Sequence, residues 1–372
     1  MKFLIINADY PTFLRSLYAN YTGVEKRSYD DQMRVRMGSL FGVADFYSSN
    51  LRKLGYEAWD VHVNNGFMQK VWARENGIKL SFSWPRRFGI RRHRFPEIGP
   101  ARNPKWMFEI LAAQIKYFKP DVILNQSIGL SSKFFREVKP YARLLIGQHA
   151  APLPEWLDLS VYDLIISSLP NLVDYFRRHG LPAEMHRLGF ESSVLECLGE
   201  GEKTKSVTFV GSLFSVHASR RRWLDHVCRH VGVEVWGGGA NGLPEDSAVF
   251  SYRKGTAWGL EMYRILQSSR ITLNHHIDVA ECYANNLRLY EATGVGTLLI
   301  TDWKENLREM FEPDKEVVAY RSPQECVELI QYYLDHDDER VAIASAGQQR
   351  TLREHNYYHR MQEMVDIVRK YL

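Results

Sequence analysis

The segment "CYANNLRLYEATGVGTLLITDW", residues 282–303, decides the fold class, because its polar start opens a helix that stops at Gly294 and leads into a buried strand. The residues up to Gly294 have helical spacing, and Asn285 or Asn286 can cap the start of that helix. The run TLLIT that follows is typical of a parallel strand buried on both faces. A helix leading into a buried strand is one unit of a doubly wound α/β sheet.

The same alternation of strand and helix extends along most of the chain. It begins with the apolar run FLIIN at 3–7, passes a long polar and aromatic stretch, and resumes with a helix predicted over 39–55 and a strand over 56–64. Residues 65–105 are predicted to be irregular. The alternation is then regular to about residue 190 and restarts near residue 206. Two α/β halves of similar size are therefore expected, with ligands at the carboxyl ends of the strands.

Composition narrows the class of protein. The chain has 372 residues, 45% of them hydrophobic, and a formal net charge of +4, which does not suggest a nucleic-acid partner. Its 4 cysteines are far apart without metal-binding spacing and are expected to be reduced thiols. No apolar run approaches the roughly 20 residues that span a bilayer. We expect a soluble, cytoplasmic protein, with peripheral contact at the inner face of the cell membrane left open.

Several residues after predicted strands are candidates for holding a phosphate or another ligand group. Gly211 and Ser212 follow the strand SVTFV, and Arg220 lies in the next helix, where it could offset negative charge. The alternative is a solvated arginine face on that helix. Gly237 could admit a ligand or form a flexible turn, and His275 could contact a ligand or be structural.

The entrance of the helix in the opening segment has the features of an anion site. Its first amides lack intrahelical partners, and the helix dipole favours negative charge there. Arg288 in the first turn opposes that dipole, which makes better sense beside an anionic ligand. Glu291, three residues on, could accept hydrogen bonds from ribose hydroxyls. The alternative is an internal Arg288–Glu291 pair that stabilises the helix.

Two longer stretches, 273–320 and 332–364, resemble the C-terminal domain of the CgeB-like, or family-1-like, bacterial glycosyltransferases. The resemblance covers roughly residues 205–365. It implies the GT-B fold, an α/β architecture of two Rossmann-like doubly wound domains facing across a cleft. It also implies that the second domain holds a nucleoside diphosphate sugar and that neither a metal nor another cofactor is needed.

The resemblance further implies domain limits and residue roles. The acceptor-side domain would span 1–190, the linker 191–205 and the donor domain 206–356, with the last helix, 357–372, packing back on the first domain. Glu291 falls where the family's glutamate binds the donor ribose. Asn285 and Asn286 would open the phosphate-binding helix, and Arg288 could reach the diphosphate. Many retaining relatives carry a glutamate eight residues earlier, where this chain has Tyr283, with Glu281 nearby.

The first half of the chain should bind the acceptor and supply a base. Asp9 and His149 each follow a predicted strand, so either could take a proton from an acceptor hydroxyl. An arginine-rich stretch in the irregular region could face an anionic acceptor or membrane, or be a solvated loop. Its arginines are Arg86, Arg87, Arg91, Arg92 and Arg94.

The sequence therefore predicts a transferase that moves a sugar from a nucleoside diphosphate sugar to an acceptor hydroxyl. The expected acceptor is a glycan, a lipid-linked sugar or a small molecule, in the biosynthesis of a surface glycan or glycoconjugate. Two alternatives remain open. One is a GT-B enzyme of another type, such as a sugar-nucleotide epimerase, and the other is a non-catalytic binding protein of the spore-coat type.

Overall fold

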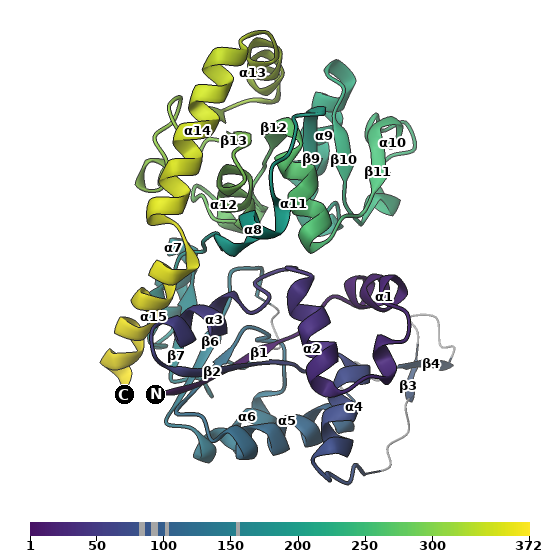
Figure 1. The fold of residues 1–372 in the computed structure, drawn as a ribbon, viewed down its shortest axis with the longest axis vertical. Helices are drawn as coiled ribbons and strands as arrows, with labels where there is room; N and C mark the ends of the chain where they lie inside the picture. Colours follow the sequence, from purple (N-terminus) through teal and green to yellow (C-terminus); the bar gives the residue numbers. More distant parts are fainter. Residues whose placement is uncertain (82–85, 91–95, 101–103, 154–156) are drawn as a thin grey trace.

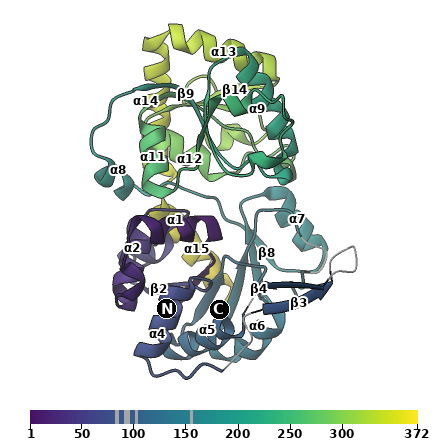
Figure 2. The same ribbon diagram turned by 90° about the vertical axis from the view of Figure 1, so that its right-hand side faces the viewer.

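A computed structural model describes most of the chain, and all structural statements concern that part (Figure 1). The described residues are 1–81, 86–90, 96–100, 104–153 and 157–372. They form two α/β domains, one above the other in Figures 1 and 2, each built on a six-stranded parallel sheet.

The first sheet has the strand order β2-β1-β5-β6-β7-β8 and all its pairings are parallel. Its central strands are continuous apolar runs because helices cover both faces, whereas the edge strands β2 and β8 contain charged residues. Their bounds are β1 (Lys2–Asn7), β2 (Glu57–His62), β5 (Val122–Asn125), β6 (Leu144–Gln148), β7 (Leu164–Ser167) and β8 (Ala183–Met185). The order reverses between β1 and β5, and β2 is an edge strand.

The second sheet has the order β11-β10-β9-β12-β13-β14, again all parallel. Counted along the chain this is 3-2-1-4-5-6, the order of a dinucleotide-binding sheet, with its switch point between β9 and β12. The bounds are β9 (Lys205–Val210), β10 (Glu234–Trp236), β11 (Arg253–Gly255), β12 (Ser269–Leu273), β13 (Leu298–Asp302) and β14 (Val318–Tyr320).

Helices flank both sheets. Those of the first domain are α1 (Pro11–Asn20), α2 (Tyr29–Gly38), α3 (Phe46–Lys53), α4 (Gly66–Glu75), α5 (Lys105–Phe118), α6 (Ser132–Val138) and α7 (Pro170–Arg178). Those that follow are α8 (Ser193–Leu198), α9 (Ala218–His230), α10 (Val249–Tyr252), α11 (Gly259–Gln267), α12 (Leu287–Gly294), α13 (Pro323–Asp335), α14 (Asp337–Glu354) and α15 (Tyr357–Tyr371). No helix in the described ranges is long and apolar enough to cross a membrane.

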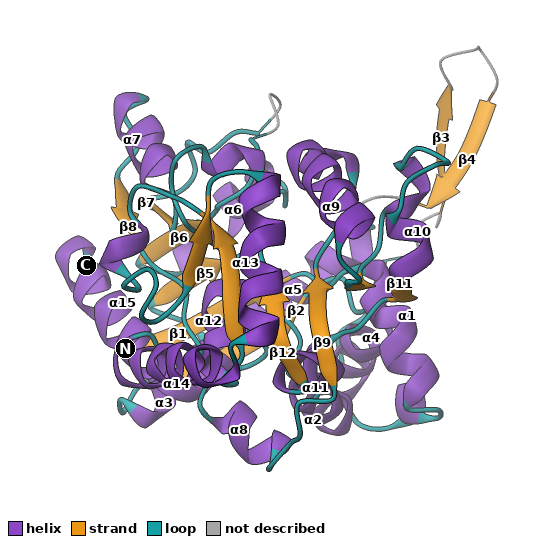
Figure 3. Ribbon diagram, turned by 90° about the horizontal axis from the view of Figure 1, so that it is seen from above, coloured by secondary structure: helices purple, strands orange, loops and turns teal. Residues whose placement is uncertain are grey.

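The sequence analysis was wrong about part of the first domain. The polar stretch after β1 holds two helices, α1 and α2, and the helix predicted over 39–55 begins only at Phe46. The region 65–105 contains helix α4 and an antiparallel hairpin of β3 (Arg86–Ile90) and β4 (Pro96–Pro100), which extends away from the domain in Figure 3. The reason is visible in α2, which buries Gln32 and Arg36 and so lacks an apolar stripe.

The carboxyl ends of the two sheets face one another. Asn171, in the first turn of α7, donates from Nδ2 to the carbonyl of Val279, in the connection between β12 and α12, over 2.9 Å. Ala280, next to it, is buried in the apolar core of the first domain. A second contact joins the end of α2 to the start of α11, where the Leu260 amide donates to the Ser39 carbonyl at 2.9 Å. Residues that follow the strands are thereby brought to the domain interface.

The chain passes between the domains twice, and the two crossings pair with each other. The Phe190 amide donates to the His355 carbonyl at 2.8 Å, and the Tyr357 amide donates to the Phe190 carbonyl at 3.0 Å. Beyond this paired crossing, α15 packs on α3 of the first domain. The Tyr357 ring lies 5.4 Å from that of Phe46 and 5.5 Å from that of Tyr47, measured between ring centroids.

Candidate functional site

The structure gathers most of the predicted donor-binding residues at the switch point of the second sheet. Gly211 and Ser212 follow β9, Gly237 follows β10, and His275 lies just past the end of β12. The start of α12 lies beside them, because its N-cap is bonded to the end of β12. Parallel strands bring such residues to one edge, where open α/β sheets bind their ligands.

The entrance of α12 is built from asparagines. Asn286 is the N-cap, and its Oδ1 accepts from the Leu289 amide at 3.3 Å, as the sequence predicted. Its Nδ2 donates to Asn274 Oδ1 at 2.7 Å, and Asn274 Nδ2 donates to Thr301 Oγ1 at 3.0 Å. The neighbouring Asn285 is buried. The helix start is therefore tied to the ends of β12 and β13.

Arg288 and Glu291 form an ion pair on this helix. Arg288 Nη1 lies 2.9 Å from Glu291 Oε2, and both side chains are largely buried. Arg288 Nη2 also donates to the carbonyl of Val210, the last residue of β9, at 3.0 Å, which places the guanidinium beside Gly211. Burial raises the pKa of the Glu291 carboxyl, while the Arg288 charge lowers it. The internal pair foreseen as the alternative therefore exists, and it lies at the switch point itself.

Arg220 and His275 belong to the framework of the site in this structure. Arg220 donates from Nε and Nη2 to the His275 carbonyl, at 3.0 and 2.6 Å, and from Nη1 to the Ser212 carbonyl, at 3.1 Å. Burial lowers the pKa of Arg220 to about 10. The His275 ring stacks on Trp223, and burial lowers its pKa to about 4. Arg220 thus holds together the loops after β9 and β12.

Gly237 has a packing reason that the sequence analysis did not foresee, since it expected either a nearby ligand or a flexible turn. A Cβ at this position would lie 1.8 Å from the Gly211 carbonyl oxygen, so only glycine lets the loops after β9 and β10 approach so closely. The Gly211 amide in turn donates to the Trp236 carbonyl at 2.9 Å. The close approach shapes the strand ends on which the candidate site is built.

A charged cluster at the ends of β12 and β13 was missed by the sequence analysis. The His276 amide and Nδ1 lie 3.0 and 2.6 Å from Asp302 Oδ1, and Lys304 Nζ lies 3.4 Å from Asp302 Oδ2. Although burial opposes it, the His276 ring holds the pKa of the Asp302 carboxyl well below its usual range. Lys304 also donates to the carbonyl of Glu281, a residue with a φ of 50°. The signal was a polar residue at or shortly after the end of each of two apolar strands.

On the acceptor side, the structure argues against Asp9 as a base. Its carboxylate is buried between Arg36, at 2.7 Å, and His62, at 3.0 Å. Burial opposes ionisation, but the His62 and Arg36 side chains hold the pKa of Asp9 well below its usual range. A general base needs a free lone pair and a pKa nearer neutrality. Asp9 instead anchors α2 to the end of β1.

His149 directly follows β6, at the edge of the sheet that faces the second domain. Burial lowers the pKa of its imidazole and so favours the neutral ring. Its Nε2 is buried and has no hydrogen-bond partner among the described residues. A neutral imidazole can act as a base, but this nitrogen must first become accessible to an acceptor.

The arginine-rich stretch is described only in part. Arg86 and Arg87 lie in β3, whereas Arg91, Arg92 and Arg94 lie outside the described residues. The described part of the chain also contains no group of three or more histidine, cysteine or carboxylate side chains that could hold a metal ion.

Comparisons with known proteins agree with this architecture. A family model described as "Glycosyl transferase-like" matches residues 219–366, which is less than half of the chain. A search of curated proteins found no match. The region matched includes α12 and the ends of β12 and β13, but not β9.

Solved structures establish the fold. A glycosyltransferase from Rickettsia africae ESF-5 is 10% identical, with a TM-score of 0.57 over 100% of this chain and 98% of the other. Anabaena Alr3699/HepE, solved in complex with UDP-glucose, is 12% identical, with a TM-score of 0.56 over 100% of both chains. Sucrose-phosphate synthase from Thermosynechococcus elongatus is 12% identical, with a TM-score of 0.54 over 100% and 99%. The chain has the two-domain α/β architecture of the GT-B fold, as predicted.

Proposed function

We propose that this protein is a glycosyltransferase that moves a sugar from a nucleoside diphosphate sugar to an acceptor hydroxyl. The observation that carries the proposal is the meeting of Arg288, Glu291 and Gly211 at the switch point of the second sheet. The family model matched to the second domain supports it. The UDP-glucose bound to the Anabaena protein of the same fold supports a nucleotide-sugar donor.

In this proposal the donor binds across the ends of β9 and β12. The first amides of α12 and the Arg288 guanidinium offset the charge of the diphosphate, which grows as the bond to the sugar breaks. Glu291 accepts hydrogen bonds from the ribose hydroxyls. Fixed dipoles and a cationic side chain can stabilise this leaving group without a metal, so we propose a metal-independent reaction.

The first domain, residues 1–190 with 357–372, would bind the acceptor, and residues 191–205 would link it to the donor domain at 206–356. In an inverting reaction the acceptor oxygen forms a bond to the anomeric carbon as the bond to the diphosphate breaks. The acceptor proton would pass to His149 Nε2. We place the reaction in surface glycan or glycoconjugate biosynthesis, in the cytoplasm, with the arginine-rich stretch as a candidate contact for an anionic acceptor or the membrane.

The test is a thermal-shift panel with UDP, GDP, dTDP and CMP, repeated with and without EDTA. One nucleoside diphosphate should raise the melting temperature in a concentration-dependent way, because a ligand that binds only the folded state stabilises it by mass action. The same nucleotide linked to its sugar should then be consumed only when an acceptor is added. Absence of any shift across the panel would overturn the proposal.

Measuring the consumption of the nucleotide sugar also separates the alternative functions. An epimerase would convert the donor sugar with no acceptor present, which product analysis by chromatography would reveal. A non-catalytic binding protein would bind the nucleotide sugar and leave it intact with every acceptor offered.

A further inference from the structure

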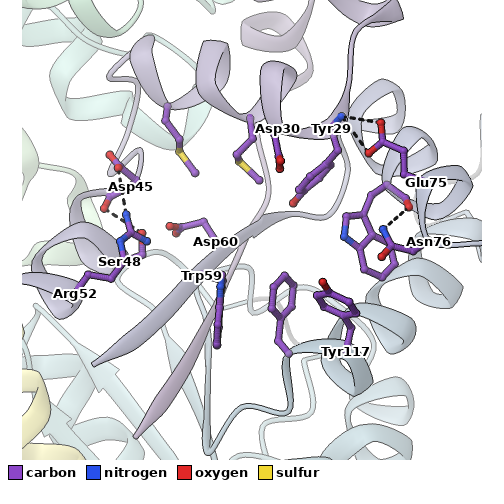
Figure 4. Close-up of a pocket in the computed structure, with 14 residues that line it drawn as sticks. Tyr29, Asp30, Asp45, Ser48, Arg52, Trp59, Asp60, Glu75, Asn76 and Tyr117 are labelled. Carbon is purple, nitrogen blue, oxygen red and sulfur yellow. Dashed lines mark hydrogen bonds and ion pairs between the residues drawn. The ribbon is translucent and has the colours of Figure 1, made fainter. Parts of the chain in front are cut away.

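A cavity lies along the outer edge of the first sheet, on the free side of β2. It has a volume of about 440 Å³, is open to solvent on one side, and is lined by residues of β2 and of α2, α3, α4 and α5 with their ends (Figure 4). Its wall residues on β2, Trp59 and Asp60, lie in the middle of the strand and not at the carboxyl end. The cavity is therefore separate from the candidate donor site, which belongs to the other domain.

The walls carry more negative than positive charge. Asp30, Asp45, Asp60 and Glu75 line the cavity together with one arginine, Arg52. Arg52 is already engaged, because its Nη1 donates to the Ala58 carbonyl at 2.8 Å and its Nη2 lies 3.7 Å from Asp45 Oδ2. An anionic ligand would be repelled by this surface.

Asp60 is the most buried carboxylate of the lining. It is 7% exposed, its Oδ1 accepts from Asn7 Nδ2 at 3.1 Å, and the Ser48 side chain also bonds to it. Against the effect of burial, the His62 and Arg52 charges lie near enough to lower its pKa, but no ion pair joins them to Asp60 within the described residues. Burial still outweighs these contacts, so a further cation beside Asp60 would stabilise its ionised form. Figure 4 shows Asp60 directed into the cavity, between Asp45 on one side and Tyr29 on the other.

The remaining walls are aromatic and sulfur-containing. Trp59 packs against Phe118 with ring centroids 4.9 Å apart, and Trp72 meets Tyr117 edge-on at 5.8 Å. From α2, Met33 and Met37 complete the lining. Aromatic faces attract cations through the ring quadrupole, and they also accept apolar groups. A carboxylate beside aromatic faces is complementary to a cation that carries an apolar body.

We propose that this cavity binds an organic cation, with its ammonium group against Asp60 and its apolar part against Trp59 and Phe118. Binding would supply the charge that the buried carboxylate lacks. Burial raises the pKa of the Asp60 carboxyl to about 6, and a bound cation would favour the ionised form again. Neither sugar transfer nor nucleotide binding is part of this inference.

The test uses three probes of similar shape and different charge: 2-phenylethylammonium, 2-phenylethanol and phenylacetate. Isothermal titration calorimetry with the full chain at pH 7.5 should show binding of the ammonium, weaker binding of the alcohol by about tenfold, and no binding of phenylacetate. Equal binding of the alcohol, or tighter binding of a neutral disaccharide such as maltose, would overturn the proposal. The proposal would also be overturned if Ca²⁺ displaced the ammonium and the ammonium bound no more tightly than the alcohol. The cavity would then be a site for a metal cation and not for an organic one.

Two variants locate the probe. Asp60→Asn keeps the shape of the side chain and should weaken ammonium binding by about tenfold while leaving the alcohol unaffected. Asp45→Asn, on the half-exposed wall, should weaken ammonium binding by a smaller factor and serves if Asp60→Asn fails to fold. Asp335→Asn, at the exposed end of α13, is the matched control and should change nothing. Unchanged ammonium binding in both cavity variants would place the site elsewhere and refute the proposal.

Discussion

Arg288 and Glu291 form an ion pair within the first turns of α12, with 2.9 Å between Nη1 and Oε2, while the same guanidinium reaches the last carbonyl of β9. The pair stabilises the helix and also holds both side chains in place for a ligand. It fixes the two side chains at the sheet's switch point before any ligand arrives. Nε of Arg288 is buried and donates no hydrogen bond within the described part of the chain.

Glu291→Gln should weaken nucleotide binding by about ten- to hundredfold, because a hydrogen bond to a charged acceptor contributes about 1.5–3 kcal/mol. The measurement is the dissociation constant of the nucleotide selected by the thermal-shift panel. Glu328→Gln, on the exposed face of α13, is the matched control. If both variants bind the nucleotide equally well, Glu291 is structural only.

Asp9→Asn should lower the free energy of unfolding by about 3–5 kcal/mol, because it leaves the buried Arg36 charge without its partner. Urea denaturation at pH 7 measures the change. The chain offers a matched pair on the same helix: Arg34 and Asp31 are also 2.7 Å apart but exposed. Asp31→Asn should therefore cost less than about 1 kcal/mol. Similar losses in the two variants would contradict the role assigned to the buried pair.

Asp60 should make stability fall as pH rises between about 4 and 6. Burial raises its pKa from 3.8 to about 6, so the folded protein keeps a proton that the unfolded chain has released. The associated stability is fully present below the unfolded pKa and is lost as pH passes through the folded pKa. Two pKa units correspond to about 3 kcal/mol.

The measurement is the difference in unfolding free energy between Asp60→Asn and the wild type at pH 4 and pH 7. The variant should gain relative to the wild type by up to that amount at the higher pH. Asp335→Asn again controls for general charge effects. A difference that does not change with pH would show that folding does not raise the pKa of the Asp60 carboxyl.

Gly259→Ala should push the domains apart at the contact between α2 and α11. A Cβ at this position would lie 1.9 Å from the Ser39 carbonyl oxygen, and the backbone has a φ of +51°. Small-angle X-ray scattering should report a larger radius of gyration for the variant. Gly255→Ala is the matched control, because it has a φ of +122° but nothing within 4 Å of its Cβ. It should show only the cost of backbone strain, about 1–3 kcal/mol, with the scattering unchanged. An unchanged radius in Gly259→Ala would mean that the contact yields locally.

The sequence predicted the parts of the fold that depend on local pattern. Apolar runs identify β1 and β13, and the polar cap at Asn286 correctly marks the start of α12. Helix α2 was not predicted, because its buried face contains Gln32 and Arg36, whose partners lie elsewhere in the chain. Local periodicity cannot show a polar face satisfied by distant residues.

The same limit applies to the candidate site. Residues at the switch point could be nominated from the strands they follow, but their contacts could not. Whether Arg220 faces a ligand or two backbone carbonyls depends on loops brought together by folding. The Asp302–His276 contact joins two strands 26 positions apart in sequence, and the charge on Asp9 depends on α2 and β2 together.

The paired crossing near Phe190 restricts how the molecule can move. Because both connections run side by side and are hydrogen-bonded to each other, we expect the donor domain to rotate about this crossing and not to slide along it. A swing separates the far contact between Ser39 and Leu260 first and leaves the neighbourhood of Phe190 nearly still. Substrate entry would then be widest on the α2–α11 side, and changes at Gly259 would alter access more than equal changes beside Tyr357.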